Sequence, residues 1–492
     1  AIGYRALHDY EADADGQGNN VAVGQSSMLN ATTGTENTAL GSVAIGSGVL
    51  TGNANVAVGY ASLFSATSAD ANVAVGYESM RASTEALNNV AVGLRALYTN
   101  VQGDSNIAIG REALYTLNPA NGVSYNTAVG DQAGKLMTTG TNNTIVGSLA
   151  GDALTTGFDS VAIGKSALST ETTGGKNVAV GARSQEDVNN SGNGNNTSVG
   201  YESMLQATTA VGTTAIGSSA IGNGVMTGDF NTAVGYLAGD ALTTGSVNVF
   251  VGSSAGLNVT TGDYNTSIGS LSMGVGVTTG DYNVALGYRA GEDLASANTT
   301  TLVGAFAGLN LTSGINNTAV GYAALATEDA HGWNTAVGYA ALNYLNAGDD
   351  SYNTAVGSGA GAAMTTGVRN TIMGGLAGDA LTTGSYNVAL GRGALSTEDA
   401  GSRNVAIGYE ALATQNAGVS VYNTAIGFQA ADHITSGVQN TIIGGLAGNA
   451  INTGDNNIVI GYNAAASAVG VDNETVIGTT ATTNAKVHGL VK

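Results

Sequence analysis

Short phrases in which polar and apolar residues alternate before a glycine recur along the whole chain. The stretch "NTAVGYAAL" at 334–342 returns nearly unchanged as "NVAVGYASL" at 55, "NTAVGYLAG" at 231 and "NVALGRGAL" at 387. The alternating "NTAVG" part, in which β-branched residues recur, predicts a short strand. The glycine after it permits a tight bend or the close approach of another backbone.

These marker glycines follow a regular period. Steps of 17 separate consecutive markers in much of the chain, as in Gly59, Gly76, Gly93 and Gly110. In all, 28 markers run from Gly3 to Gly478, spaced 17 or slightly more apart. A short fixed period is typical of stacked coils. The sequence therefore predicts an all-β parallel β-solenoid or β-roll of about 28 coils over residues 1–478, with a C-terminal tail over 479–492. Segments such as "YEALATQNAG" leave room for a helical turn at most.

A longer period of 70 is superimposed on the coils. It separates Gly130 from Gly200, Gly287 from Gly357 and Gly357 from Gly427, each time as three steps of 17 and one of 19. Within these blocks the position four after the marker tends to alternate in pairs, as in Gly291 and Gly308 followed by Leu325 and Leu342. We infer that the unit of duplication is a block of four coils, with the extra residues of the fourth step in a loop.

Two positions in the repeat are restricted in residue type. Asn stands four residues before the marker in 23 of the 27 copies that include this position. In stacked coils such an Asn can form an amide ladder, or it can simply cap a turn; the near absence of Gly and Asp favours the ladder. The representative ladder positions are Asn126, Asn143, Asn177, Asn317, Asn334, Asn353, Asn370, Asn387 and Asn404. Ala or Ser follows three residues after the marker, which predicts tight packing at Ala96, Ala150, Ala255, Ala341 and Ala447.

The amino-acid composition limits the classes of partner that the chain can bind. The chain has 75 Gly, 1 Pro and 0 Cys, and Ala and Val supply most of its apolar residues. Coils with so thin a core favour association with a further chain. The net charge is −21 and Lys and Arg do not cluster, so the chain lacks the basic face that nucleic acid requires. The apolar runs are far shorter than the roughly 20 residues that span a bilayer, so no membrane insertion is expected.

The polar residues give no clear catalytic or metal-binding pattern, and we expect no enzyme and no cofactor. The acidic segment "HDYEADADGQGNN", with Asp9 to Asp15, is interpreted as a solvated loop, with structural calcium as the alternative. The motif "TEDA" at 327–330 and 397–400 offers carboxylates for glycoside hydrolysis. Its recurrence one four-coil block apart favours a duplicated loop instead.

One aromatic residue is a candidate glycan contact. Trp333, with His331 before it, stands where other coils carry Tyr or Arg, as at Tyr264 and Tyr352. An exposed aromatic ring can stack on a sugar. The alternative, which the shared Tyr position favours, is an aromatic that packs beside the Asn row.

The phrases resemble two related families. "NVAIG", "NIAIG" and "SVAIG", with Ala or Ser three residues on, resemble the head repeats of trimeric autotransporter adhesins, which are parallel β-rolls assembled as homotrimers. The fuller phrase "NNTAVGYAAL…TTG…YN" is closer to bacteriophage tail-fibre repeats that precede a self-cleaving intramolecular chaperone. The end, "NETVIGTTATTNAKVHGLVK", resembles the segment that leads into this chaperone.

The resemblance implies a homotrimeric fibre, extracellular or on a virion surface. The function it implies is that of a tail-fibre shaft that positions binding to a host surface glycan. The alternatives are a bacterial trimeric surface adhesin and a fibre-borne polysaccharide depolymerase. A chaperone encoded beyond Lys492 would indicate the tail fibre, and a membrane anchor the adhesin.

Overall fold

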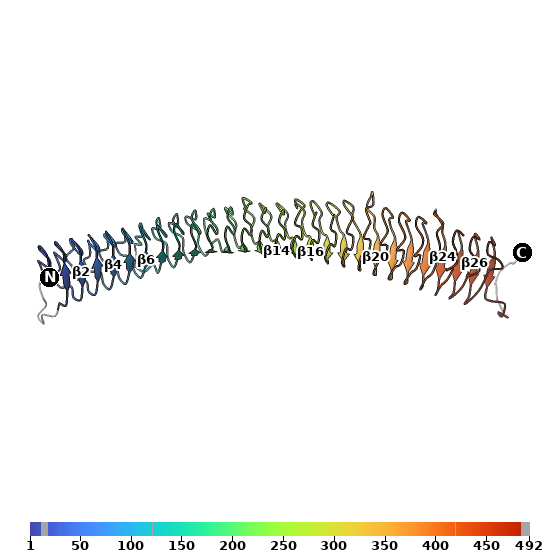
Figure 1. Ribbon diagram of the computed structural model, residues 1–492, viewed down its shortest axis with the longest axis horizontal. Coiled ribbons are helices and arrows are strands. Elements are labelled where there is room, and N and C mark those ends of the chain that lie inside the picture. The colour runs from blue at the N-terminus through green and yellow to red at the C-terminus, as the bar shows by residue number, and fades with distance from the viewer. Residues whose placement is uncertain (11–17, 121, 419, 484–492) are drawn as a thin grey trace. The chain divides into compact units, whose positions relative to one another are not determined.

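The computed structural model describes residues 1–10, 18–120, 122–418 and 420–483. Over these residues the chain is all-β, with no helix. It divides into two compact units, residues 1–248 and 249–492. Each unit is a parallel β-solenoid in which every coil contributes one strand, drawn as one arrow per coil in Figure 1. The predicted fold class is therefore confirmed.

All strands are three residues long. The strands of the first unit are β1 (Val21–Val23), β2 (Thr38–Leu40), β3 (Val56–Val58), β4 (Val73–Val75), β5 (Val90–Val92), β6 (Ile107–Ile109), β7 (Thr127–Val129), β8 (Thr144–Val146), β9 (Val161–Ile163), β10 (Val178–Val180), β11 (Thr197–Val199), β12 (Thr214–Ile216) and β13 (Thr232–Val234). Those of the second are β14 (Val249–Val251), β15 (Thr266–Ile268), β16 (Val284–Leu286), β17 (Thr301–Val303), β18 (Thr318–Val320), β19 (Thr335–Val337), β20 (Thr354–Val356), β21 (Thr371–Met373), β22 (Val388–Leu390), β23 (Val405–Ile407), β24 (Thr424–Ile426), β25 (Thr441–Ile443), β26 (Ile458–Ile460) and β27 (Thr475–Ile477).

Strands of neighbouring coils pair in parallel and in phase with the repeat. In β4 and β5, for example, Val73 pairs with Val90 and Ala74 with Ala91. Each of the 27 strands ends one residue before a marker glycine. The first of the 28 predicted coils differs, because Ile2 before Gly3 forms only an isolated bridge. The last strand ends at Ile477, beside the predicted boundary of the shaft, and residues 484–492 lie outside the described residues.

The return side of each coil has no strand, although it is also bonded from coil to coil. After Gly93, Arg95 and Leu97 adopt left-handed φ values of 55° and 50°. The N–H of Arg95 donates to Tyr77 O at 2.9 Å in the preceding coil, and the N–H of Leu97 donates to Ala113 O at 3.0 Å in the next. The left-handed residues interrupt the right-handed backbone that a helix requires, and their N–H groups bond to the neighbouring coils. For this reason the return side forms no helix, including the segment "YEALATQNAG", for which the sequence left room for a helical turn.

The marker glycine is required on two grounds. Gly59 has φ of 131°, a conformation that side chains strongly disfavour, and a Cβ atom added to it would lie 2.5 Å from Gly76 O. The marker positions of adjacent coils therefore lie in backbone contact.

The core is thin, and a larger side chain at one core position is matched by a smaller residue at another. The middle residue of a strand points inward and is usually Ala, as at Ala74 and Ala91, both fully buried. Where that residue is Ile, Leu or Phe, glycine stands four residues after the marker of the same coil. A Cβ atom on Gly134 or Gly151 would lie 3.1 or 3.2 Å from the Cδ1 atom of Ile145. The paired alternation of glycine and leucine thus reflects packing between coils.

Candidate interaction surfaces

The Asn row lies inside the coils and joins them. The N–H and the Nδ2 of Asn143 both donate to Asn126 Oδ1, at 3.1 Å each, and Nδ2 also donates to Gly157 O at 2.8 Å. The same backbone N–H to Oδ1 bond links consecutive residues from Asn317 to Asn404, through Asn334, Asn353, Asn370 and Asn387. These side chains, with Asn177, are 0 or 1% exposed. They hold the stack together and are not available to a ligand.

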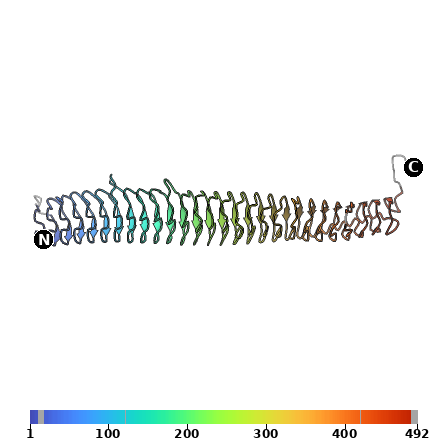
Figure 2. The same ribbon diagram turned by 90° about the horizontal axis from the view of Figure 1, so that it is seen from above.

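The longer coils disturb this row. Nδ2 of Asn177 and Nδ2 of Asn404 are buried without a hydrogen-bond partner among the described residues. Nδ2 of Asn334 donates at 3.2 Å to Gly332 O in its own segment. After each of these three residues the next Asn of the row follows 19 positions later, and the extended loop between them removes the carbonyl that the amide meets elsewhere. Figure 2 shows two such loops of the first unit extending beyond the neighbouring coils.

The small positions three residues after the marker also belong to the interior. Ala96, Ala150, Ala255, Ala341 and Ala447 are fully buried. In Ala96 the N–H donates to Gly93 O at 3.4 Å, which closes the turn of the coil.

Glutamates of the repeated loops are buried, where other coils place an apolar side chain. Glu171 accepts from the N–H of Gly174 at 2.8 Å and of Asn190 at 3.1 Å, and burial raises the pKa of its carboxyl group. In the "TEDA" motif at 397–400, Glu398 accepts from the N–H of Gly401 at 2.6 Å and from Gln415 Nε2 at 2.7 Å. These carboxylates hold the loop backbone.

His331 and Trp333 occupy different environments. Glu328, the buried glutamate of the other "TEDA" motif, accepts from the N–H of His331 at 3.1 Å and lies 3.2 Å from its Nδ1. Burial raises the pKa of the Glu328 carboxyl group. Trp333 is 45% exposed and stacks on Tyr352, with 5.7 Å between ring centroids. Of the two candidate glycan contacts, the structure thus places Trp333 on the surface and ties His331 into a loop.

In each unit the outward side of the strands is an uncharged surface of aliphatic and Thr side chains, which we call the outer strand face. The first residue of every strand is Val, Thr or Ile, and the third is Val, Ile, Leu or Met. None of these residues is fully buried, and Ile109, Ile216 and Met373 are among the exposed ones. The face has no charged residue in either column, although the chain is strongly acidic.

The described residues contain no group of three or more His, Cys, Asp or Glu that could hold a metal ion. In the acidic segment interpreted as a solvated loop, with calcium as the alternative, Asp9 Oδ1 lies 2.5 Å from His8 Nδ1, and residues 11–17 lie outside the described part of the chain. Asp263 and Asp281 occupy equivalent positions in neighbouring coils, and Asp281 accepts from the N–H of Asp263 at 2.8 Å. The carboxylate therefore interacts with the neighbouring backbone.

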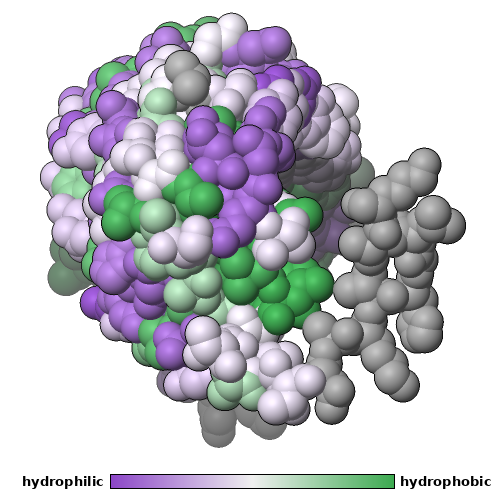
Figure 3. Space-filling model, turned by 90° about the vertical axis from the view of Figure 1, so that its right-hand side faces the viewer, coloured by the Kyte–Doolittle hydropathy of each residue, from purple (hydrophilic) through white to green (hydrophobic). Residues whose placement is uncertain are grey.

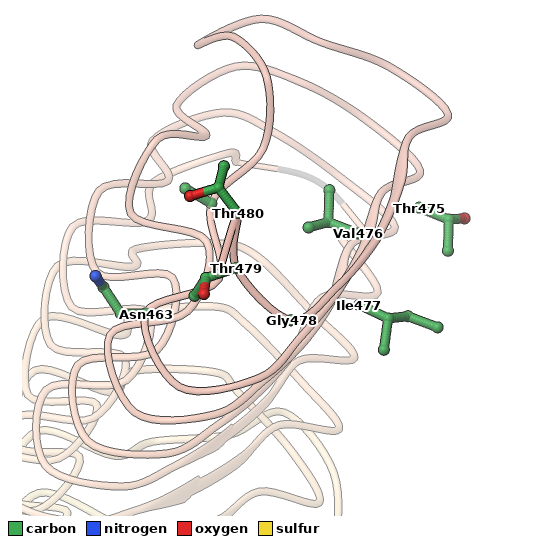
Figure 4. A pocket seen from close by; sticks show the side chains of 8 residues that line it. Asn463, Thr475, Val476, Ile477, Gly478, Thr479 and Thr480 are labelled. Atoms are coloured by element: carbon green, nitrogen blue, oxygen red, sulfur yellow. The ribbon is translucent and has the colours of Figure 1, made fainter. Parts of the chain in front are cut away.

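A cavity of about 510 Å³ lies at the last coil, where β27 is the final described strand. Figure 4 shows Val476 directed into the coil and Thr475 and Ile477 directed away from it. The lining consists of small polar and aliphatic residues without a charged group or an aromatic ring. Figure 3, which faces this end, shows hydrophobic and hydrophilic residues exposed side by side. The cavity is the open end of a coil and lacks the convergent polar groups of a ligand site.

Within the described ranges no helix has the length and apolar character needed to cross a membrane. Comparison with known proteins gives no assignment, since neither a family model nor a curated protein matches the chain.

Proposed function

We propose that the chain is a structural and adhesive fibre segment, the shaft of a phage tail fibre that positions binding to a host surface glycan. The observation that carries the proposal is the outer strand face. All 27 strands direct two uncharged columns outward, and the third residue of each strand is apolar without exception. The third residues form an apolar row along each unit, and monomeric soluble proteins rarely expose extended apolar surfaces.

The partner best matched to this face is a second copy of the same chain. Apolar rows recur at the strand spacing of roughly 4.8 Å, and only a surface with the same spacing can pack against them over many coils. Further copies have this spacing. The resemblance to trimeric fibres supports a stoichiometry of three.

The experiment compares two double variants of the full chain by sedimentation equilibrium and light scattering. V356K/M373K places two lysines on the outer strand face of β20 and β21. T366K/T383K places the same charges on exposed loop positions of the same coils. We expect the wild type and the loop variant to be trimeric. The face variant should dissociate at protein concentrations about tenfold or more above those at which the wild type dissociates, because each buried unpaired charge is costly. A monodisperse wild-type monomer would overturn the proposal.

A bacterial trimeric surface adhesin is the alternative location for the same fibre. Antibodies raised against the chain distinguish the two in electron micrographs. Label along virion fibres supports the tail fibre, and label on the bacterial surface without virions supports the adhesin.

A further inference from the structure

One exposed row of side chains in the second unit alternates aromatic rings with guanidinium groups. Each member stands five residues before a marker glycine and directly before a residue of the Asn row. We call the row the Arg–aromatic ladder; it consists of Trp333, Tyr352, Arg369, Tyr386, Arg403 and Tyr422. Its members come from consecutive coils, so neighbours are roughly 4.8 Å apart at the strand spacing.

The ladder is stacked along much of its length. The Cζ atom of Arg369 lies 6.0 Å from the ring centroid of Tyr352 and 5.6 Å from that of Tyr386. The Cζ atom of Arg403 lies 5.4 Å from the centroids of both Tyr386 and Tyr422. Each guanidinium is thus held between two rings by cation–π contact. The ring faces are occupied, and a ligand meets the guanidinium edges and the tyrosine hydroxyl groups.

The backbone beneath the ladder is fixed before any ligand arrives. The next residue after each member is buried Asn, and the N–H of Asn370 and of Asn404 each donate at 2.9 Å to the Oδ1 of the preceding Asn. A surface ordered in this way loses little conformational entropy on binding.

The two arginines of the ladder differ from other arginines of the second unit in their partners. Across the described residues neither Arg369 nor Arg403 forms an ion pair, whereas Arg289 pairs with Glu292 at 2.6 Å and Arg392 with Glu410 at 3.6 Å. Arg369 Nη1 donates to Tyr386 Oη at 2.7 Å, and Arg403 Nη1 to Ser420 Oγ at 2.5 Å. In a chain with a net charge of −21, two neighbouring cations of this kind form a local positive site.

We propose that the Arg–aromatic ladder binds an acidic polysaccharide whose carboxylates are about one disaccharide apart. Arg369 and Arg403 stand two coils apart, roughly 10 Å at the strand spacing, which is close to the length of a disaccharide. A guanidinium edge binds a carboxylate through two parallel N–H bonds. The proposal names the glycan class for the proposed fibre function and rests on that function.

Nucleic acid fits the ladder poorly. Its phosphates follow one another about every 3.4 Å along each strand of a duplex, much closer than the two arginines. A dense polyanion is also repelled by the acidic remainder of the chain. A sparsely charged polysaccharide meets the two cations with less repulsion.

The experiment measures binding of hyaluronan oligosaccharides, which carry one carboxylate per disaccharide, to the full chain. The variant R369Q/R403Q removes both ladder cations. The matched control R289Q/R392Q removes two arginines that have acidic partners. Because each double variant removes two arginines, the two variants have equal net charge. Neutral dextran and single-stranded DNA serve as comparison ligands, and the state of association is measured on the same samples.

We expect wild type and control to bind hyaluronan with affinities within about twofold of each other. We expect R369Q/R403Q to bind at least about tenfold more weakly, because charge-assisted hydrogen bonds are lost. Dextran should not bind. Equal losses in both variants, tighter binding of DNA, or absence of hyaluronan binding by the wild type would each overturn the proposal. If the chain does not bind hyaluronan as expected but is still trimeric, the ladder proposal fails and the fibre proposal stands. The two proposals can therefore fail separately.

Discussion

A Cβ atom on Gly308 would lie 2.7 Å from the Cδ2 atom of Leu302, so the glycine of one coil makes room for the leucine in the strand before it. Gly291 in the preceding coil faces the same leucine, with its Cδ1 atom 2.7 Å from a would-be Cβ. The coil of Ala336, in contrast, carries a buried leucine four residues after the marker, Leu342. The core volume is thus conserved by exchange between two positions.

Substitutions at Leu302 and Gly308 should compensate for each other in the free energy of unfolding. L302A leaves a cavity and should cost about 2–5 kcal/mol, and G308L overfills the core at about 1–3 kcal/mol. The double variant should cost less than the sum by roughly 1 kcal/mol or more. Leucine is tolerated in the local backbone, since Leu325 has φ of 53° at the equivalent position. Denaturant unfolding of the four proteins in a double-mutant cycle checks this, and strict additivity would contradict it.

Loss of an Asn from the row should depend on how many bonds it makes. Asn370 Nδ2 donates to Gly384 O at 2.9 Å and its Oδ1 accepts from the N–H of Asn387 at 2.9 Å. N370A therefore leaves two buried groups unpaired and should cost about 2 kcal/mol or more. N404A is the control, because its Nδ2 has no partner among the described residues and only the acceptor role is lost. Hydrogen–deuterium exchange of the adjacent coils should rise more in N370A than in N404A; an equal rise would count against the bonded ladder.

The two adjacent glycines at the end of β21 should respond differently to alanine. Gly374 has φ of 135°, and its Cβ would lie 2.5 Å from Gly391 O. A Cβ on Gly375 would have Ser358 O as its nearest neighbour, at 3.8 Å. G374A should lower the melting temperature markedly, because the backbone must shift in two coils. G375A should leave the melting temperature close to that of the wild type and the free energy of unfolding within about 1 kcal/mol of it, because alanine there restricts mainly the unfolded chain. Similar melting temperatures for the two variants would refute the close approach.

Stability should depend on pH with opposite signs at two glutamates. Burial raises the pKa of Glu171, so the folded state binds this proton more tightly than the unfolded chain does. The contribution of Glu171 to stability is then greatest at or below its ordinary pKa and is lost as pH rises through the raised value. The melting temperature of the wild type should therefore fall relative to that of E171Q as the pH rises above the ordinary pKa of a glutamate.

Glu410 provides the control of opposite sign. The Gln429 amide, which donates to Glu410 Oε2 at 2.9 Å, lowers the pKa of this carboxyl group. Its contribution is present above the ordinary pKa and is lost as pH falls through the lowered one. Relative to E410Q, the wild type should therefore lose melting temperature in acid. Differences of the same sign for both glutamates would contradict the assignment.

The period of the marker glycines was sufficient to predict the coil and its strand, but not that the Asn row lies inside the coil. It did not predict the return side, because side chains such as Arg95 and Leu97 give no sequence signal for left-handed backbone. It also did not show that Glu171 and Glu328 are buried, since their loops read as polar surface. The ladder of Arg369 and Arg403 was visible in principle, as Tyr and Arg alternate five residues before successive markers. That alternation gains meaning only when the stacking and the surroundings of the guanidinium groups are known.

The block of four coils has a consequence for how the gene can change. Each block of 70 closes with a longer loop, and the blocks from Gly287 to Gly357 and from Gly357 to Gly427 follow one another directly. Each coil contacts mainly its neighbours. Unequal recombination between two blocks therefore adds or deletes whole blocks while the glycine contacts, the Asn bonds and the exchanged core positions stay in phase. We expect alleles of this gene to differ in length by whole blocks more often than by single coils. Variation of this kind would change the reach of the protein within a few generations, with no new fold to be selected.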